Sequence, residues 1–240
     1  MSELQKINVS AILFDFGGCL DSNGVHTRHL VFNTFVDVKL LEDYDAPEFA
    51  EVWGGVDAEI NEKGTAVNMK LEQMNQFLVK RIAKDLGVEN QTGQLAEVAR
   101  RLTNFQKRTL ETNRIVVEKL SKDFSLGIIS NFYGNLNIIL EEFKMKDLFT
   151  CVVESYHAKV AKPSPAIFEK ALKGVGKSAG ECLMVGDNPE RDILPAQKLG
   201  MKTVLIQSKS NRNKDDRPAK CQADGYISEV VALLDLVQKA

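Results

Sequence analysis

Hydrophobic residues follow two different spacings along the chain. The first apolar run, residues 9–16, predicts one buried strand that stops at Gly17-Gly18. From residue 22 to about residue 114 no strand pattern is visible, and apolar residues instead recur three and four positions apart. Helices are predicted there over residues 46–63, 71–86 and 94–109, with Gly87 ending the second.

After residue 114, short apolar runs alternate with segments of helical spacing. The predicted strands are residues 126–129, 151–153, 182–185, 203–206 and 226–227. The predicted helices are residues 116–122, 136–143, 165–172, 193–199 and 228–238. Alternating strands and helices predict an α/β fold, a Rossmann-like parallel sheet sandwiched by helices. Residues 208–220 are polar without periodicity and predict a solvated loop.

Composition and charge narrow the class of protein. The chain has 240 residues, a net charge of -2 and 44% hydrophobic residues, which is ordinary for a soluble globular protein. No excess of positive charge favours nucleic acid or an anionic membrane as a partner. The first apolar run is too short for a signal peptide or a membrane span. Four scattered cysteines without metal-binding spacing predict reduced thiols in a cytoplasmic protein.

Polar side chains that could take part in catalysis or binding stand at four predicted strand ends. They are Asp15, the pair Ser130-Asn131, Lys162 ahead of the helix that begins at Pro165, and Asp187 with Asp192. In a parallel sheet, ligands bind at the carboxyl ends of the strands, so these side chains are expected to share one site. Each alone has an ordinary alternative: a turn or helix cap for the aspartates and the Ser-Asn pair, and a solvated surface side chain for the lysine.

Taken together, the order and spacing of these residues resemble the haloacid dehalogenase superfamily. The resemblance covers the whole chain. It implies a Rossmann-like core at residues 1–21 and 115–240, with an inserted helical cap at residues 22–114. Among the cap residues, His26, His29, Trp53 and Asp57 are candidates for substrate contacts, without a ranking.

The resemblance also implies residue roles and a cofactor. Asp15 matches the nucleophile that becomes an aspartyl phosphate, and Lys162 matches the lysine that neutralises it and the transferring phosphoryl group. The implied Mg²⁺ ligands are Asp15, the Gly17 carbonyl, Asp187 and, more distantly, Asp192. The implied phosphate-binding groups are Gly18, Ser130, Asn131 and Lys162. The resemblance also implies a catalytic role for Ser130.

One position departs from the family's phosphatases. They carry a second aspartate two residues after the nucleophile as the general acid and base, where this chain has Gly17; Cys19 replaces their threonine. A glycine required for the backbone angle, or a proton donor elsewhere such as Asp21, His26 or His29, are both open explanations.

Three functions compete. The first is a magnesium-dependent phosphatase of small phosphorylated metabolites, similar to the sugar 1-phosphatase members. The others are a slow or non-catalytic phosphate-binding regulator and a metal-independent 2-haloacid dehalogenase. Against the dehalogenase, Asp187 is retained, whereas those enzymes typically replace it. Substrate identity and oligomeric state stay open.

Overall fold

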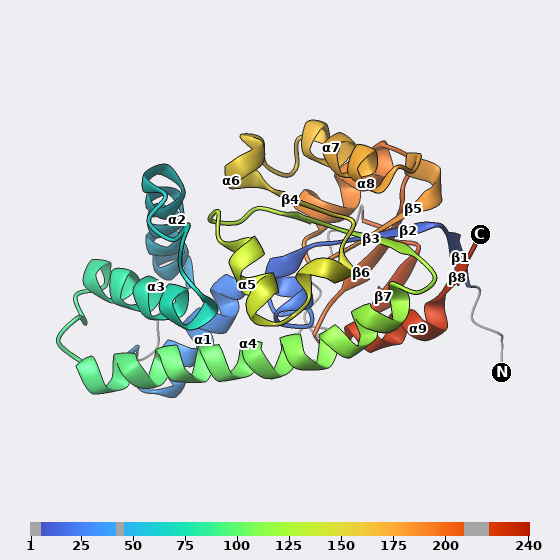
Figure 1. Cartoon of the computed structure of the whole chain (residues 1–240). Coiled ribbons are helices and arrows are strands. Elements are labelled where there is room, and N and C mark those ends of the chain that lie inside the picture. The colour runs from blue at the N-terminus through green and yellow to red at the C-terminus, as the bar shows by residue number, and fades with distance from the viewer. Residues whose placement is uncertain (1–5, 42–45, 209–220) are drawn as a thin grey trace.

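Parallel strands form the centre of the molecule. The computed structural model describes residues 6–41, 46–208 and 221–240. Six parallel strands lie in the order β4-β3-β2-β5-β6-β7, which confirms the predicted α/β fold (Figure 1). Their bounds are β2 Ala11–Phe14, β3 Ser125–Ser130, β4 Cys151–Glu154, β5 Cys182–Gly186, β6 Lys202–Ile206 and β7 Gly225–Ile227.

Both faces of this sheet are covered, which explains why its strands are apolar without alternation. On β2, Ala11 and Leu13 belong to an apolar cluster that includes Ile167 and Phe168 of helix α7 (Pro165–Val175). The alternate β2 residues belong to the larger cluster on the other face. Helices α5 (Leu136–Glu142), α6 (Ser155–Ala158) and α8 (Leu194–Lys198) complete the connections between strands.

The ends of the core differ from the prediction. The first apolar run divides into β1 (Ile7–Val9) and β2, and the chain turns over Phe16–Leu20 instead of continuing the strand. The predicted helix over residues 228–238 is wrong: α9 spans only Leu233–Leu236, and β8 (Val237–Lys239) pairs with β1 in a second parallel sheet. The predicted loop over residues 208–220 lies almost entirely outside the described residues.

Four helices follow β2 along the chain. They are α1 (Thr27–Asp37), α2 (Ala46–Lys63), α3 (Leu71–Asp85) and α4 (Thr92–Leu120). Helix α4 runs from the other three to the underside of the sheet (Figure 1). It replaces the two separate helices predicted over residues 94–109 and 116–122 and crosses the predicted boundary at residue 115, so the domain division stays a prediction. No helix in the described part of the chain is long and apolar enough to cross a membrane.

Candidate active site

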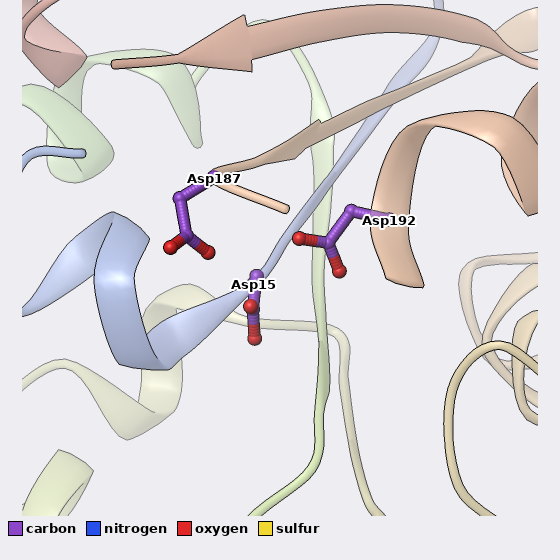
Figure 2. Close-up of side chains that lie close together, drawn as sticks. All are labelled: Asp15, Asp187 and Asp192. Atoms are coloured by element: carbon purple, nitrogen blue, oxygen red, sulfur yellow. The ribbon is translucent and has the colours of Figure 1, made fainter. Parts of the chain in front are cut away.

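The carboxyl ends of the central strands bring three aspartates together. Asp15 directly follows β2, and its N–H donates to the Val185 carbonyl of β5 at 2.8 Å. Asp187 directly follows β5, and Asp192 lies in the helical turn Pro189–Ile193 that comes next. The three carboxylates face one another (Figure 2), and one oxygen of each lies within 4.8 Å of the others. The structure thus brings these three predicted site residues together.

Lys162 lies among these carboxylates. Its Nζ is 2.9 Å from Asp15 Oδ1 and 2.6 Å from Asp192 Oδ1, and only 2% of its side chain is exposed. Burial by itself would lower the pKa of Lys162, but the two carboxylates outweigh it and raise that pKa above its ordinary value. Lys162 is therefore a charged group inside the site, and the solvated-lysine alternative is wrong.

One oxygen of Asp15 holds all of that side chain's hydrogen bonds. Oδ1 accepts from Ser130 Oγ at 2.9 Å and from the Phe16 N–H at 2.7 Å, in addition to its contact with Lys162. No described group donates to Oδ2. The carboxylate is thus fixed by one oxygen while the other stays available to a metal ion or an electrophile.

Asn131 fixes the loop that carries Lys162. Its Nδ2 donates to the Lys162 carbonyl at 3.0 Å, and its Oδ1 accepts from the Lys162 N–H at 2.8 Å. This paired contact explains how a residue on an irregular segment is held against the sheet. The side-chain amide of Asn131 is used for positioning, which leaves its backbone N–H as the group for the phosphate role that the resemblance implies.

Gly18 is required by its neighbour Asp187. The φ of Gly18 is +87°, and a Cβ on it would lie 2.3 Å from Asp187 Oδ2. The Gly18 N–H donates to Asp21 Oδ1 at 2.8 Å. This donor is therefore already used, and the structure gives Gly18 a steric role in place of the expected phosphate contact.

Asp187 and Asp192 differ in how their oxygens are used. No described group donates a hydrogen bond to the Asp187 carboxylate, and burial together with Asp192 and Asp15 raises its pKa well above the ordinary value. Asp192 accepts from Lys162 on Oδ1 and from the Asn188 N–H on Oδ2 at 3.0 Å. Burial raises the pKa of Asp192 to about 6. Asp187 is thus the better placed of the two to bind a cation directly.

The residues present fit a divalent cation. Three carboxylates meet one lysine, so two negative charges in this buried cluster have no described counter-charge. Closely spaced carboxylate oxygens are the ligands that Mg²⁺ prefers. Asp15 Oδ2 and Asp187 are the oxygens that a cation would meet first.

A cavity of about 460 Å³ opens above this cluster. Its floor includes Asp15, Lys162 and Asp187 from the core, and its opposite wall comes from helices α1 to α4. All four cap residues that sequence reasoning suggested line it: His26, His29, Trp53 and Asp57. The site therefore lies between the sheet edge and the helical insert, where enclosed binding sites are common.

Comparison with known families identifies the chain. A family model described as "Haloacid dehalogenase-like hydrolase" matches residues 12–206. The chain belongs to this family. The match runs from the strand before Asp15 to the end of β6, so it includes every residue of the cluster described above.

Curated relatives of this hydrolase match it over shorter segments. A glyceraldehyde 3-phosphate phosphatase from Pyrococcus furiosus is 36% identical over 96 residues, 40% of either chain. A phospholysine phosphohistidine inorganic pyrophosphate phosphatase from Mus musculus is 35% identical over 80 residues, 33% of this chain and 30% of the relative. The matched segments thus span less than half of either relative.

Solved structures resemble the hydrolase over nearly its full length. A 2-haloacid dehalogenase from Pseudomonas syringae has a TM-score of 0.52 at 18% identity and covers 95% of this chain and 97% of its own. A HAD phosphatase from Thermococcus onnurineus has a TM-score of 0.51 at 21% identity and covers 93% and 95%. Since both reactions occur among these neighbours, the likeness shows the fold alone.

The backbone at position 17 does not explain why a glycine stands where the family's phosphatases carry an aspartate. The backbone there has φ -73° and ψ 124°, an ordinary extended conformation that any residue adopts. A Cβ at this position would lie 3.3 Å from Thr27 Oγ1, the tightest contact in its surroundings. Glycine is therefore not required by the backbone, which answers one of the two open explanations.

Of the other possible proton donors, Asp21 is already in use. Its carboxylate accepts from the Gly18 N–H, from Ser22 Oγ at 2.6 Å and from Gln106 Nε2 at 2.9 Å. Burial raises the pKa of Asp21 to about 6. These contacts give Asp21 a positioning role between the first loop and helix α4.

His26 begins helix α1 and is held in one orientation. Its Nδ1 accepts from the Arg28 N–H at 3.2 Å. Burial, and then the neighbouring side chains of His29, Arg28 and Arg191, lower the pKa of His26 to about 4. The imidazole is therefore neutral near pH 7, with its proton on Nε2.

Sequence reasoning gave no role to three residues of the cavity wall. Tyr133 donates from its hydroxyl to Asp57 Oδ1 at 2.7 Å and so joins helix α2 to the core. Arg28 and Arg191 also line the cavity. The only signal in the sequence was proximity: Tyr133 follows Ser130-Asn131, Arg28 stands between two histidines, and Arg191 precedes Asp192.

Proposed function

We propose that this protein is a magnesium-dependent phosphohydrolase that cleaves phosphate esters of small metabolites through an aspartyl phosphate on Asp15. One observation carries the proposal. Asp15 has one oxygen fixed by Lys162 and Ser130, while its other oxygen and the carboxylate of Asp187 have no described hydrogen-bond donor. A fixed carboxylate beside an open pair of hard oxygen ligands suits metal-assisted phosphoryl transfer.

In the proposed first step, one carboxylate oxygen of Asp15 attacks phosphorus, while the other carboxylate oxygen would hold the cation, and the bond from phosphorus to the ester oxygen breaks. The leaving oxygen departs with its electron pair and takes up a proton. In the second step, a water molecule attacks the phosphorus of the aspartyl phosphate, which releases inorganic phosphate and restores the carboxylate. Both steps need positive charge against the equatorial phosphoryl oxygens.

Residues of the site would supply that positive charge and would position the phosphoryl group. The ammonium of Lys162 offsets the charge of Asp15 and faces the transferring group. The Asn131 backbone N–H is assigned to the phosphoryl oxygens, and the Ser130 hydroxyl, which donates to Asp15 Oδ1 in the described structure, would turn to the same oxygens when a phosphoryl group binds. A Mg²⁺ held by Asp15, the Gly17 carbonyl and Asp187 would screen the repulsion between two anions. Asp192 is assigned mainly to Lys162, because both of its oxygens are already in use.

The comparisons support phosphatase chemistry over dehalogenation. Two relatives that are more than 30% identical over part of the chain carry phosphatase in their names. The retained Asp187, with its carboxylate open toward Asp15, supports a metal-dependent reaction. The small size of the cavity favours metabolites as substrates over macromolecules.

A direct assay separates the three functions. The purified protein is tested with para-nitrophenyl phosphate, with Mg²⁺ and then with the metal removed by EDTA, and with a 2-chloro acid while halide release is followed. We expect phosphate release that requires Mg²⁺ and no halide release. Metal-independent halide release would instead show a dehalogenase, and Mg²⁺-dependent phosphate binding without turnover would show a regulator.

A further inference from the structure

The cavity of the proposed active site carries more positive charge than the reacting phosphoryl group explains. Arg28 lies at the start of α1 in the helical insert, and Arg191 lies in the turn after β5 in the core. Both line the same cavity as Asp15. One cavity is thus lined by two arginines, one from the helical insert and one from the core.

No carboxylate pairs with either guanidinium in the described part of the chain. Among the described residues, the Arg28 side chain contacts His29 Nε2 at 3.3 Å and forms no ion pair. The Arg191 side chain has no hydrogen bond or ion pair with any residue that the structure describes, although its backbone N–H donates to Asn188. Arginines elsewhere on this chain, such as Arg81 and Arg101, do form ion pairs with neighbouring acids.

The acids that line the cavity are committed to other groups. Asp15 contacts Lys162, Asp21 accepts three hydrogen bonds, and Asp57 accepts from Tyr133. Asp187 lies in the cluster that fits a divalent cation. That cation and Lys162 together balance the three carboxylates of the floor, so the two arginines remain as surplus positive charge.

The same cavity is lined by His26, whose ring is close enough to feel the charge of both arginines. Burial is the largest cause that lowers the pKa of His26, and the next largest are the neighbouring His29, Arg28 and Arg191. A neutral imidazole beside two guanidinium groups leaves the wall able to receive an anion. Guanidinium groups bind carboxylate and phosphate through paired, charge-assisted hydrogen bonds.

We infer that Arg28 and Arg191 form a second anion site, so that the preferred substrates are phosphate monoesters whose leaving group carries its own anionic group, a carboxylate or a second phosphoryl group. The inference rests on the proposed function, because it names the substrate class of the same site. A cavity of about 460 Å³ has room for a phosphoryl group and a short leaving group of this kind. Because the two arginines come from the insert and the core, such a substrate would bridge them.

Matched substrate pairs test the inference. We compare kcat/KM for meta-carboxyphenyl phosphate against meta-carbamoylphenyl phosphate, and for propanediol bisphosphate, halved for its two phosphoryl groups, against propanediol monophosphate. We expect the anionic member of at least one pair to be favoured by about tenfold or more, the effect of one charge-assisted hydrogen bond. The pair that shows the preference identifies the second group as carboxylate or phosphoryl.

Variants locate the preference. Arg28→Gln and Arg191→Gln should each bring the ratio of the favoured pair close to one, and Arg28→Lys and Arg191→Lys should keep part of it. Arg108→Gln, which removes an exposed arginine of α4 that does not line this cavity, should leave the ratio as in the wild type. A wild-type ratio near one in both pairs, or a ratio that neither glutamine variant changes, would overturn the inference.

A binding measurement separates failure of this inference from failure of the proposed function. The carboxy and carbamoyl benzyl phosphonates, whose carbon–phosphorus bond is not cleaved by this reaction, are titrated calorimetrically with Mg²⁺ present. Tighter binding of the carboxy compound, lost in Arg28→Gln and in Arg191→Gln, supports the second anion site even if no ester is hydrolysed. Equal binding of the two phosphonates argues against the site even if esters are hydrolysed.

Discussion

At the scale of single residues, replacing Lys162 is expected to change both the stability of the fold and the reaction rate. Replacing it by methionine leaves Asp15 and Asp192 buried without their counter-charge. Removing one partner of a buried ion pair typically costs about 3–5 kcal/mol. We therefore expect Lys162→Met to lower the free energy of unfolding by an amount in this range, measured by urea denaturation in EDTA, and to abolish turnover.

A double variant separates these two effects. Lys162→Met combined with Asp192→Asn removes both partners of the 2.6 Å contact and should recover much of the lost stability. Turnover should stay absent, because the positive charge at the phosphoryl group is still missing. Recovery of turnover together with stability would show that Lys162 has only a structural role.

Gly17 allows a test in the opposite direction. Its backbone angles accept an aspartate, and its missing side chain would point toward Thr27 Oγ1. Gly17→Asp should accelerate hydrolysis of alkyl phosphates by about 10²-fold or more, the low end for a positioned general acid, and should change aryl phosphates much less. Gly17→Asn has nearly the same shape without the proton, so equal rates for the two variants would exclude acid catalysis by the new group.

The residue-scale predictions from sequence succeeded where a strand end fixes a position. Asp15, Ser130 and Asp187 meet because their strands are neighbours in one parallel sheet, and the sequence pattern predicted the strands and their parallel sheet without their order. The Gly18 and Asn131 contacts were not predictable, because they depend on which side chain reaches which backbone group across the loop. Arg28 and Arg191 were missed for the same reason.

At the scale of elements, a buried polar network joins the first loop to the helical insert. Asp21 accepts from Gln106 of α4, and Gln106 Oε1 accepts from Asn75 of α3 at 2.8 Å. Asn75 also donates to Thr103 at 3.1 Å. The orientation of α3 and α4 over the site is therefore tied to the loop that follows Asp15.

Gln106→Leu should break this network. The change leaves Asp21 Oδ2 and a donor of Asn75 buried with one partner fewer, which typically costs about 1–3 kcal/mol. Urea denaturation measures the cost, with Gln76→Leu on the exposed side of α3 as the control, expected to be close to wild type. A cost no larger than that of the control would mean that the network contributes little to holding α3 and α4.

The elements themselves were predicted with uneven success. Strands β3, β5 and β6 came out close to their observed bounds because uninterrupted apolar runs mark strands buried on both faces. Helix α1 was missed, since only Val31, Thr34 and Phe35 are buried along it and the apolar spacing is weak. The β8 strand was missed because its pairing with β1 is made by residues far apart in sequence.

At the scale of the whole molecule, the uncompensated charge of the aspartate cluster predicts that a divalent cation stabilises the fold. Ligand at about 100 times its Kd adds about 2.7 kcal/mol to the free energy of unfolding. Excess Mg²⁺ should therefore raise the melting temperature in a thermal denaturation scan. Asp187→Asn should lose most of this rise, while the exposed control Asp147→Asn should keep it.

The stability of Asp187→Asn without a metal ion can also be predicted. Burial and neighbouring acids raise the pKa of Asp187, so the folded state loses stability as the pH rises from the ordinary pKa of an aspartate towards that raised pKa. In EDTA near neutral pH, Asp187→Asn should thus be at least as stable as the wild type. A variant that is less stable in EDTA, or that keeps the full response to Mg²⁺, would contradict the assignment of Asp187 as a cation ligand.

The central claim is that Asp15 receives the phosphoryl group, and trapping that group tests it most directly. The protein is mixed with Mg²⁺ and an excess of para-nitrophenyl phosphate, quenched in acid during turnover, digested and mapped by mass spectrometry, with Asp15→Asn treated in parallel. We predict a phosphoryl group on the peptide that contains Asp15, absent from the variant. A phosphoryl group on any other residue, or turnover that continues in Asp15→Asn, would contradict the account.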